Sequence, residues 1–200
     1  MLKTFATICI IGMFTSSCTS KKASRTEGSH EAEQDLTMIV GTYTSGDSKG
    51  LYSFRFNEEN GTATALSEAE VENPSYLVPS ADGKFIYAVS EFSNEQAAAN
   101  AFAFNKEEGT FRLLNTQKTG GEDPCYIITN GSNVVTANYS GGSISVFPID
   151  KDGSLLPASE VVKFKGSGAD KERQEKPHLH CVRITPDGKY LFADNLGTDQ

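Results

Sequence analysis

The segment Pro177–His180 holds the side chains of this chain that are best suited to chemistry, two histidines separated by one leucine. In an extended backbone, side chains two residues apart point to the same face, and the neighbouring proline favours that extension. Paired imidazoles can act as general base and electrophile when water attacks a carbonyl group, because neutral histidine titrates near the working pH. We therefore expect His178 and His180 to be catalytic.

Two other roles for this pair remain open. His-x-His also occurs in metal sites, but the residues that follow, Cys181–Ile184, do not continue with acidic or histidine ligands. With three histidines in the whole chain, a zinc ion would need carboxylates to complete its coordination. Hydrogen-bonded structural histidines are the third reading. We expect no metal and no cofactor, and the sequence contains no Gly-rich phosphate loop, serine nucleophile elbow or CxxC pair.

Polar residues at the ends of other apolar runs are further candidates for the site. Asp194 could orient a histidine through its carboxylate, as in a catalytic triad, or simply cap a turn. Four residues are candidates for substrate binding, and each has the alternative reading of an ordinary polar residue at a strand end: Glu91, Asn138, Tyr139 and Asn195.

Short apolar runs separated by turn residues dominate the chain from residue 36 onward. We find twelve runs of alternating or β-branched residues and no helical periodicity of useful length. Asp-Gly pairs at positions 82–83, 152–153 and 187–188 separate several of the runs, and glycine accepts the positive φ of a tight turn without steric cost. The pattern predicts an all-β protein.

The runs also repeat at one length. VPSADGKFIYAVSE (78–91) reappears as ITPDGKYLFADNL (184–196), with ITNGSNVVTANYSGG (128–142) as the same unit with an altered turn. Aligning the strand ends makes Gly41, Ala88, Ala137 and Ala193 equivalent, at intervals of 47, 49 and 56 residues. The longest interval contains a polar insert, Gly166–Lys176, which we expect to be a surface loop. Each interval has room for about four strands, which is the composition of a β-propeller blade.

We therefore predict a β-propeller over residues 36–200, with about three and a half blades of four antiparallel strands. A β-sandwich is the competing fold, but sandwiches do not repeat at a single blade length. Propellers close with 4–8 blades, so we expect this chain to be the N-terminal part of a longer protein that is a monomer at full length. A half-propeller that closes as a dimer is the alternative.

Five segments resemble the seven-bladed lactonase family, which includes bacterial propeller-type 6-phosphogluconolactonases and fungal carboxymuconate-cyclising enzymes. They are GTYT (41–44), YAVSE (87–91), ANYSGGSISVFPI (137–149), KPHLH (176–180) and TPDGKYLFADNLGTDQ (185–200). The resemblance covers Met38 to Gln200. It implies a seven-bladed propeller of which about half is present, with the arginines that the family places around its central funnel lying beyond residue 200.

The resemblance implies hydrolysis of a small-molecule lactone of a sugar acid, such as 6-phosphogluconolactone. In such a reaction a histidine takes the proton of the attacking water, and cationic groups stabilise the oxyanion. The alternative is a non-catalytic propeller of the cell envelope that binds sugars or proteins on its funnel face. Cyclisation of a muconate needs the same groups and stays open.

The N-terminus resembles a bacterial lipoprotein signal peptide over residues 1–17. A basic start is followed by an apolar stretch, Thr4–Phe14, and by small residues before Cys18. We expect cleavage before Cys18, lipidation of its thiol, and a flexible tether over residues 18–35 that includes His30. This predicts a protein anchored on the periplasmic side of the bacterial cell envelope, with an ordinary signal peptide and secretion as the alternative.

Charge and cysteine content limit the remaining partners. The formal net charge of −8 argues against nucleic acid, and no apolar run reaches the roughly 18–20 residues of a membrane span. We therefore expect contact with a membrane through the lipid anchor alone. Cys125 and Cys181 remain in the propeller region, and we expect both to be reduced, buried side chains rather than a disulfide.

Overall fold

The computed structural model describes residues 36–200, which form thirteen β-strands and no helix. Within this range there is accordingly no helix that is long and apolar enough to cross a membrane. The predicted signal peptide (1–17), the lipidation site Cys18 and the tether (18–35) lie outside the described residues.

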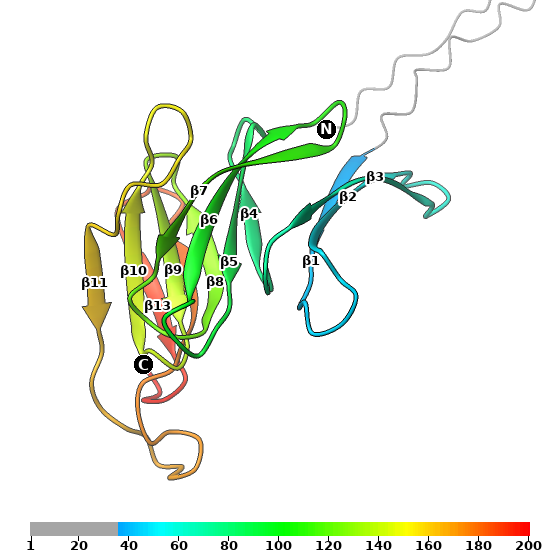
Figure 1. Ribbon diagram of the computed structural model, residues 1–200. Coiled ribbons are helices and arrows are strands. Elements are labelled where there is room, and N and C mark those ends of the chain that lie inside the picture. The colour runs from blue at the N-terminus through cyan, green and yellow to red at the C-terminus, as the bar shows by residue number, and fades with distance from the viewer. Residues whose placement is uncertain (1–35) are drawn as a thin grey trace, which may run out of the picture. The chain divides into compact units, whose positions relative to one another are not determined.

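The strands form four antiparallel sheets, each made of strands that are consecutive in the sequence (Figure 1). The first sheet contains β1 (Leu36–Gly41), β2 (Gly50–Phe56) and β3 (Ala63–Glu70). The second contains β4 (Leu77–Pro79), β5 (Phe85–Ser90), β6 (Ala98–Asn105) and β7 (Thr110–Lys118). The third contains β8 (Pro124–Thr129), β9 (Asn133–Asn138), β10 (Ser143–Pro148) and β11 (Glu160–Lys163). The fourth contains β12 (Leu179–Ile184) and β13 (Leu191–Asn195).

The all-β prediction is confirmed, and each complete sheet is the four-stranded meander expected of a propeller blade. The structure has one strand more than the twelve predicted runs. The additional strand is β3, whose sequence ATALSEAE has Leu66 as its one large apolar residue and lacks an apolar alternation. It forms because β2 supplies a full ladder of backbone partners, so pairing decides its conformation where side-chain pattern does not.

Neighbouring sheets pack against each other through apolar side chains on both faces. Along β5, Ile86 and Ala88 point into a core shared with the first sheet, whereas Tyr87 and Val89 point into a core shared with the third sheet. All four side chains are at most 1% exposed. Because successive side chains of a strand alternate between faces, a strand buried on both sides needs a continuous apolar run, as β5 has.

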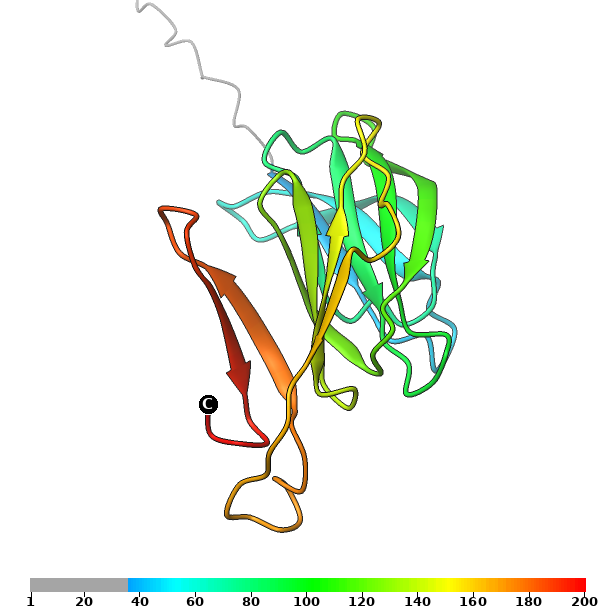
Figure 2. The same cartoon turned by 90° about the vertical axis from the view of Figure 1, so that its left-hand side faces the viewer.

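A third core joins the third and fourth sheets. Tyr126 and Ile144 of the third sheet pack there with Leu179 and Val182 of β12. Figure 2 shows the β12–β13 hairpin beside the third sheet, reached by a long connection from β11. The predicted polar insert, Gly166–Lys176, lies in this connection and is a surface loop.

The innermost strands of the third and fourth sheets share the same irregularity. Pairing with β9 passes from Pro124 to Tyr126 and skips Cys125. Pairing with β13 passes from Leu179 to Cys181 and skips His180. A bulged residue of this kind is left outside the ladder, so its side chain is re-aimed. Cys125 and His180 therefore occupy equivalent positions.

The shared bulge corrects the sequence alignment by one residue. Ala137 pairs with Tyr126 just past the first bulge, and Asp194 pairs with Cys181 just past the second. The residue equivalent to Ala137 is therefore Asp194 rather than Ala193. The alignment matched small residues at the strand ends, whereas hydrogen-bond register determines equivalence.

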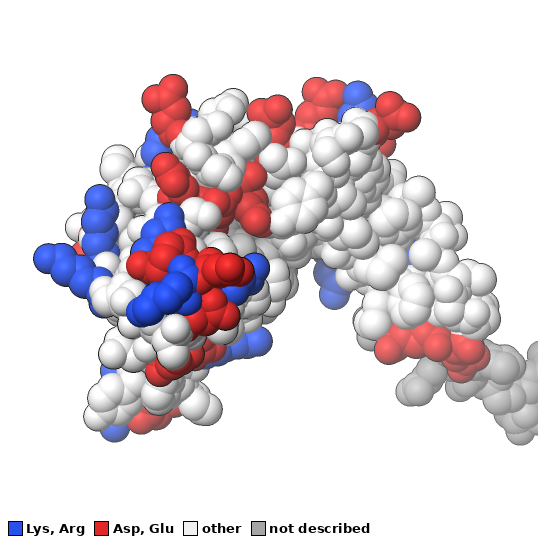
Figure 3. All heavy atoms as spheres, turned by 90° about the horizontal axis from the view of Figure 1, so that it is seen from below, with Lys and Arg blue, Asp and Glu red and all other residues white. Residues whose placement is uncertain are grey.

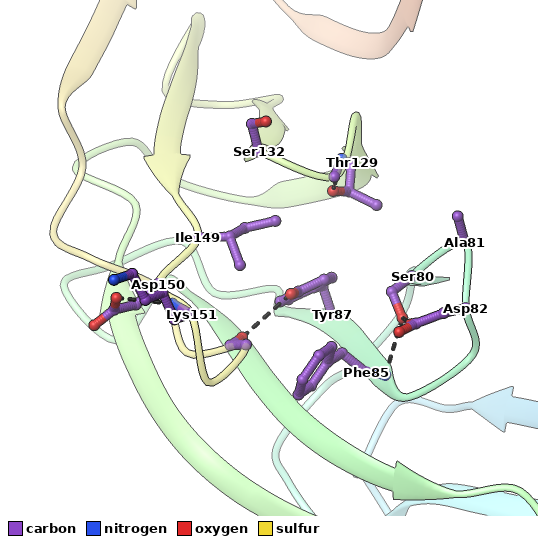
Figure 4. A pocket seen from close by; sticks show the side chains of 12 residues that line it. Ser80, Ala81, Asp82, Phe85, Tyr87, Thr129, Ser132, Ile149, Asp150 and Lys151 are labelled. Carbon is purple, nitrogen blue, oxygen red and sulfur yellow. Dashed lines mark hydrogen bonds between the residues drawn. The ribbon is translucent and has the colours of Figure 1, made fainter.

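The hairpin turns gather on the face opposite to these bulges. A cavity of about 490 Å³ lies there, between the turns at residues 80–82, 129–132 and 150–153, and Figure 4 shows the side chains that line it. The Tyr87 hydroxyl donates a hydrogen bond to the carbonyl of Gly153 over 3.2 Å, which ties the second sheet to the third. Gly153 has φ +87°, and a Cβ at this position would collide with the Phe85 ring.

We expect Gly153→Ala to destabilise the protein more than Gly188→Ala. Both glycines follow an aspartate and have positive φ, so both variants carry the same backbone strain, about 1–2 kcal/mol. A Cβ at Gly188 meets no atom within 4 Å, whereas one at Gly153 would push into the Phe85 ring, an overpacking cost of about 1–3 kcal/mol. Urea unfolding of the two variants measures the difference. Equal losses of stability would contradict this packing.

Candidate active site

The sequence-predicted site residues lie at the face where β1, β5, β9 and β13 end, here called the strand-end face. Glu91 follows the last residue of β5, Tyr139 follows the last residue of β9, and Asn195 ends β13. His178 immediately precedes β12, which is paired with β13. Figure 3 looks onto this side of the molecule and shows acidic side chains interspersed with Lys and Arg, not a field of one sign.

His178 is buried and firmly held. It is 7% exposed, and its backbone N–H donates a 2.9 Å hydrogen bond to Oδ1 of Asn195. Its ring nitrogen Nε2 lies 3.3 Å from Oε1 and 3.4 Å from Oε2 of Glu175. The other ring nitrogen, Nδ1, is buried and has no hydrogen-bond partner. Nδ1 of His178 thus faces the protein interior, and Nε2 faces Glu175.

The ring of Tyr139 brings the two histidines together. His178 stacks on it with the ring centroids 4.5 Å apart and the planes 24° apart. His180 meets the same ring edge-on, at 6.1 Å and 82°. Both imidazoles therefore contact the same ring, but their surroundings differ. His178 is buried, whereas His180 is exposed and no hydrogen bond or ion pair joins its side chain to any residue from 36 to 200.

The two asparagines predicted to bind substrate lie below the surface. Asn138 is fully buried; its Oδ1 accepts from Thr136, and its Nδ2 donates to Ser143 and Ser145 over 3.0 and 2.8 Å. Asn195 is 3% exposed and accepts from the backbone N–H groups of His178 and Gly197. Both side-chain amides thus hydrogen-bond to protein groups near the strand ends. All the polar side-chain atoms of Asn138 are engaged in this way, so it cannot bind a ligand in this geometry.

Glu91 forms a separate cluster between the first and second sheets. Its carboxylate accepts hydrogen bonds from the Tyr43 hydroxyl, at 2.9 Å, and from the Ser75 hydroxyl. Burial, together with the hydrogen bond to Glu91, raises the pKa of Tyr43. Asn73 joins the same cluster by donating to the backbone carbonyl of Glu91. Sequence reasoning found Glu91 but neither of its hydroxyl partners. Tyr43 follows β1 of the first sheet, and Ser75 lies just before β4 of the second.

The carboxylate beside the histidines is not the one predicted. The Asp194 side chain is exposed and forms neither a hydrogen bond nor an ion pair with any residue in the described range. Glu175 from the polar insert pairs with His178 instead. The pKa of Glu175 lies below its usual value, first because its own backbone N–H donates to the carboxylate and second because of His178. The detectable signal was its position three residues before His178, at the end of the insert.

The described residues show no group of three or more His, Cys, Asp or Glu side chains placed to hold a metal ion. The cavity on the opposite face contains no histidine. Its Asp82 is already engaged by Ser80 and by the backbone N–H of Lys84. The exposed imidazole of His180 on the strand-end face is therefore the group best suited to proton transfer among residues 36–200.

Cys125 lies against the backbone of His180. Its sulfur is 3.6 Å from the His180 carbonyl and 3.7 Å from that of Leu179, so the thiol contacts the segment that carries the site. Cys125 and Cys181 are free thiols, in agreement with the expectation that they do not form a disulfide, but both side chains are partly buried rather than buried. Burial, followed by the nearby charge of Glu91, raises the pKa of the Cys125 thiol to about 12.

Residues 37–200 match the family model described as lactonase, 7-bladed β-propeller. Among curated proteins, the chain is similar to the 6-phosphogluconolactonase of Bacillus subtilis, with 38% identity over 167 residues. That alignment covers 80% of this chain and 46% of the relative. The chain thus spans about half the length of the curated relatives it matches.

Two solved structures are also similar to this chain. A candidate 6-phosphogluconolactonase of Bacteroides fragilis superposes with a TM-score of 0.83 and 73% identity, over 84% of this chain and 48% of that protein. The periplasmic gluconolactonase of Pseudomonas aeruginosa superposes with a TM-score of 0.74 and 32% identity, over 80% of this chain and 47% of that protein.

We expect Cys125 to be unreactive in the folded protein. Raising its pKa from an ordinary value of 9 to about 12 lowers its thiolate fraction at pH 8 by about 10³, and the thiolate is the nucleophile. Iodoacetamide should therefore modify Cys125 about 10²–10³-fold more slowly in buffer than in urea, measured by peptide mass spectrometry. Equal rates, or a Cys125–Cys181 linked peptide without reductant, would contradict a reduced thiol that is protected by the fold.

Proposed function

The chain belongs to the lactonase family of seven-bladed β-propellers, and we propose that the full-length protein hydrolyses the lactone of a sugar acid. The names of its relatives, 6-phosphogluconolactonase and gluconolactonase, support this class of substrate. One structural observation indicates which residue would act in this reaction. The exposed imidazole of His180 lies against the edge of Tyr139 with no side-chain hydrogen bond or ion pair to any described residue, so its ring nitrogens are available to substrate and water.

We assign His180 the role of general base. One of its ring nitrogens takes a proton as the water oxygen bonds to the lactone carbonyl carbon, which gives a tetrahedral oxyanion. Collapse of this intermediate breaks the ring C–O bond, and the imidazolium returns its proton to the departing oxygen. The products are the open hydroxy acid and the regenerated imidazole. Positively charged groups that stabilise the oxyanion are part of this proposal, as the chemistry requires them.

His178 has a supporting role in the proposed reaction. Its two nitrogens face Glu175 and the protein interior, so it cannot exchange a proton with bound substrate in this geometry. Its ring instead packs on Tyr139 and helps to set the position of His180. The two histidines that the sequence paired as acid and base are thereby given different tasks.

Replacing His180 with Asn should lower lactone hydrolysis about 10²–10⁴-fold and leave the melting temperature unchanged, because the side chain is exposed. His178→Asn should lower both quantities, since a buried ring contact and a hydrogen bond are lost. Acid release from glucono-δ-lactone, followed by pH-stat and corrected for spontaneous hydrolysis, measures the rate. His30→Asn in the predicted tether is the matched control and should behave as wild type.

Each alternative mechanism gives its own result in the same assay. Loss of activity in EDTA would point to a metal and overturn the assignment of His180 as an unaided base. Full activity in His180→Asn would remove His180 from the reaction. A wild-type protein that binds sugar acids or a protein partner without hydrolysing lactones would favour the non-catalytic propeller.

We further propose that the protein is exported and anchored to the bacterial cell envelope through lipid on Cys18. The basic, apolar and small-residue pattern of residues 1–17 supports export, as does the similarity to a relative named as periplasmic. An enzyme in that compartment would act on lactones available outside the cytosol, so a lactone other than 6-phosphogluconolactone is the substrate we expect.

Cys18→Ala should abolish the anchor. The thiol of Cys18 is the predicted site of lipid attachment, and several acyl chains at one residue hold a protein firmly to a bilayer. We expect the variant to take up no labelled palmitate and to move from the membrane pellet to the soluble fraction. Cys9→Ala, within the apolar stretch, is the control and should leave both properties intact. Labelled, sedimenting Cys18→Ala would refute the lipoprotein prediction.

A further inference from the structure

The polar insert Gly166–Lys176 is fastened to the strand-end face on both sides of Glu175. On one side, Nε2 of Gln174 donates to the carbonyl of Leu196 over 3.0 Å and to Oδ1 of Asp199 over 2.6 Å. On the other side, Nζ of Lys176 donates to the carbonyl of Ser140 over 2.9 Å. The residue between these two anchors is therefore held next to both the end of β13 and the turn after β9.

The insert also has an internal structure that supports these anchors. The Asp170 carboxylate accepts from the backbone N–H groups of Glu172 and Arg173, at 2.9 and 3.1 Å. Oε1 of Gln174 accepts from the backbone N–H of Asp170, and the Gly168 N–H donates to the Gln174 carbonyl. Hydrogen bonds of this kind give a short loop a defined conformation, so the insert presents the Glu175 side chain in one place.

The Glu175 carboxylate lies on the outer side of the His178 ring. The His178 side chain is 9% exposed and the Glu175 side chain 48% exposed, so the carboxylate covers the imidazole from the solvent side. An ionised carboxylate only accepts hydrogen bonds, so Nε2 of His178 carries the proton in this contact. A carboxylate partner fixes both the tautomer and the direction of an imidazole in this way.

The contact continues from His178 to the exposed histidine. His178 stacks on Tyr139 at 4.5 Å, and Tyr139 meets His180 at 6.1 Å. If the His178 ring turned, the surface on which the Tyr139 ring packs would change, and with it the contact of Tyr139 with His180. Displacement of a reacting group by about 1 Å can lower a rate by about 10²-fold, so the orientation of the buried ring has consequences at the exposed one.

We propose that Glu175 is the positioning residue of this site: it fixes the imidazole of His178 and, through the stacked Tyr139, holds His180 in its working position. The proposal rests on the hydrolytic function proposed above. It assigns the polar insert a task, since the insert carries the one carboxylate bonded to a histidine among residues 36–200. If Glu175 had a structural role alone, its partly exposed pair with His178 would contribute little to stability and nothing to the rate.

Two variants of Glu175 in the full-length protein test the proposal. Glu175→Ala removes the acceptor, so we expect kcat for glucono-δ-lactone to fall about 10–100-fold with little change in KM. Glu175→Gln keeps an acceptor oxygen at the same distance and should restore most of the lost kcat. Glu172→Gln is the matched control. Its carboxylate is in the same loop and exposed, without a side-chain hydrogen bond or ion pair to any described residue, and its loss should change nothing.

A second measurement does not depend on activity. ¹⁵N chemical shifts of the histidine rings report which nitrogen carries the proton, with His178→Asn identifying the signals of His178. We expect protonated Nε2 in wild type and in Glu175→Gln, and a mixture of tautomers in Glu175→Ala. Loss of melting temperature without loss of kcat, or an unchanged tautomer in Glu175→Ala, would overturn the proposal.

The two proposals fail in different ways. If the wild-type protein hydrolyses no lactone, the proposed function is wrong, and the ring spectra alone decide whether Glu175 orients His178. If wild type is active but Glu175→Ala keeps the wild-type kcat, the function stands and Glu175 has no positioning role.

Discussion

Burial of both faces of each central sheet is the constraint on which the rest of this structure depends. Tyr87 and Val89 fill one side of β5 while Ile86 and Ala88 fill the other, so apolar packing takes up both faces of this strand. Polar side chains that could meet a ligand are therefore found at strand ends and at the bulged residues of the innermost strands. The site occupies this remaining space, with Tyr139 just past β9 and His180 in the bulge of β12.

Below the strand-end face, buried amides replace the apolar packing of the sheets. Asn100, Asn138 and Asn195 each bond to backbone or hydroxyl groups near the end of a strand, where the backbone turns and loses regular partners. In this network both amide atoms of Asn138 are hydrogen-bonded, whereas Nδ2 of the buried Asn195 has no partner among the described residues. Buried hydrogen bonds of this kind make the geometry of a polar network specific. The network supports the backbone from which Tyr139 and His178 project.

Much of the fold could be predicted from the sequence, because burial on both faces leaves long apolar runs such as Phe85–Ser90. The strand β3 could not, since backbone pairing and not side-chain pattern creates it. His178 and His180 were identifiable from residue type and spacing alone. The carboxylate that pairs with His178 was not identifiable from the sequence. The repeat pattern pointed to Asp194 at a strand end, whereas Glu175 belongs to an insert that lies outside the repeats. Asn138 illustrates the same limit, since sequence places it at a strand end without revealing that its amide is internal.

The bulge shared by Cys125 and His180 separates the residue that faces the site from the residues that maintain the ladder. Pairing resumes on either side of the bulge whether that residue is a thiol or an imidazole. A substitution there can thus change the side chain while the hydrogen-bonded register stays the same. In the third and fourth sheets, the residue type at this one position can therefore change over evolution independently of the fold, from an unreactive thiol in one sheet to an exposed imidazole in the next.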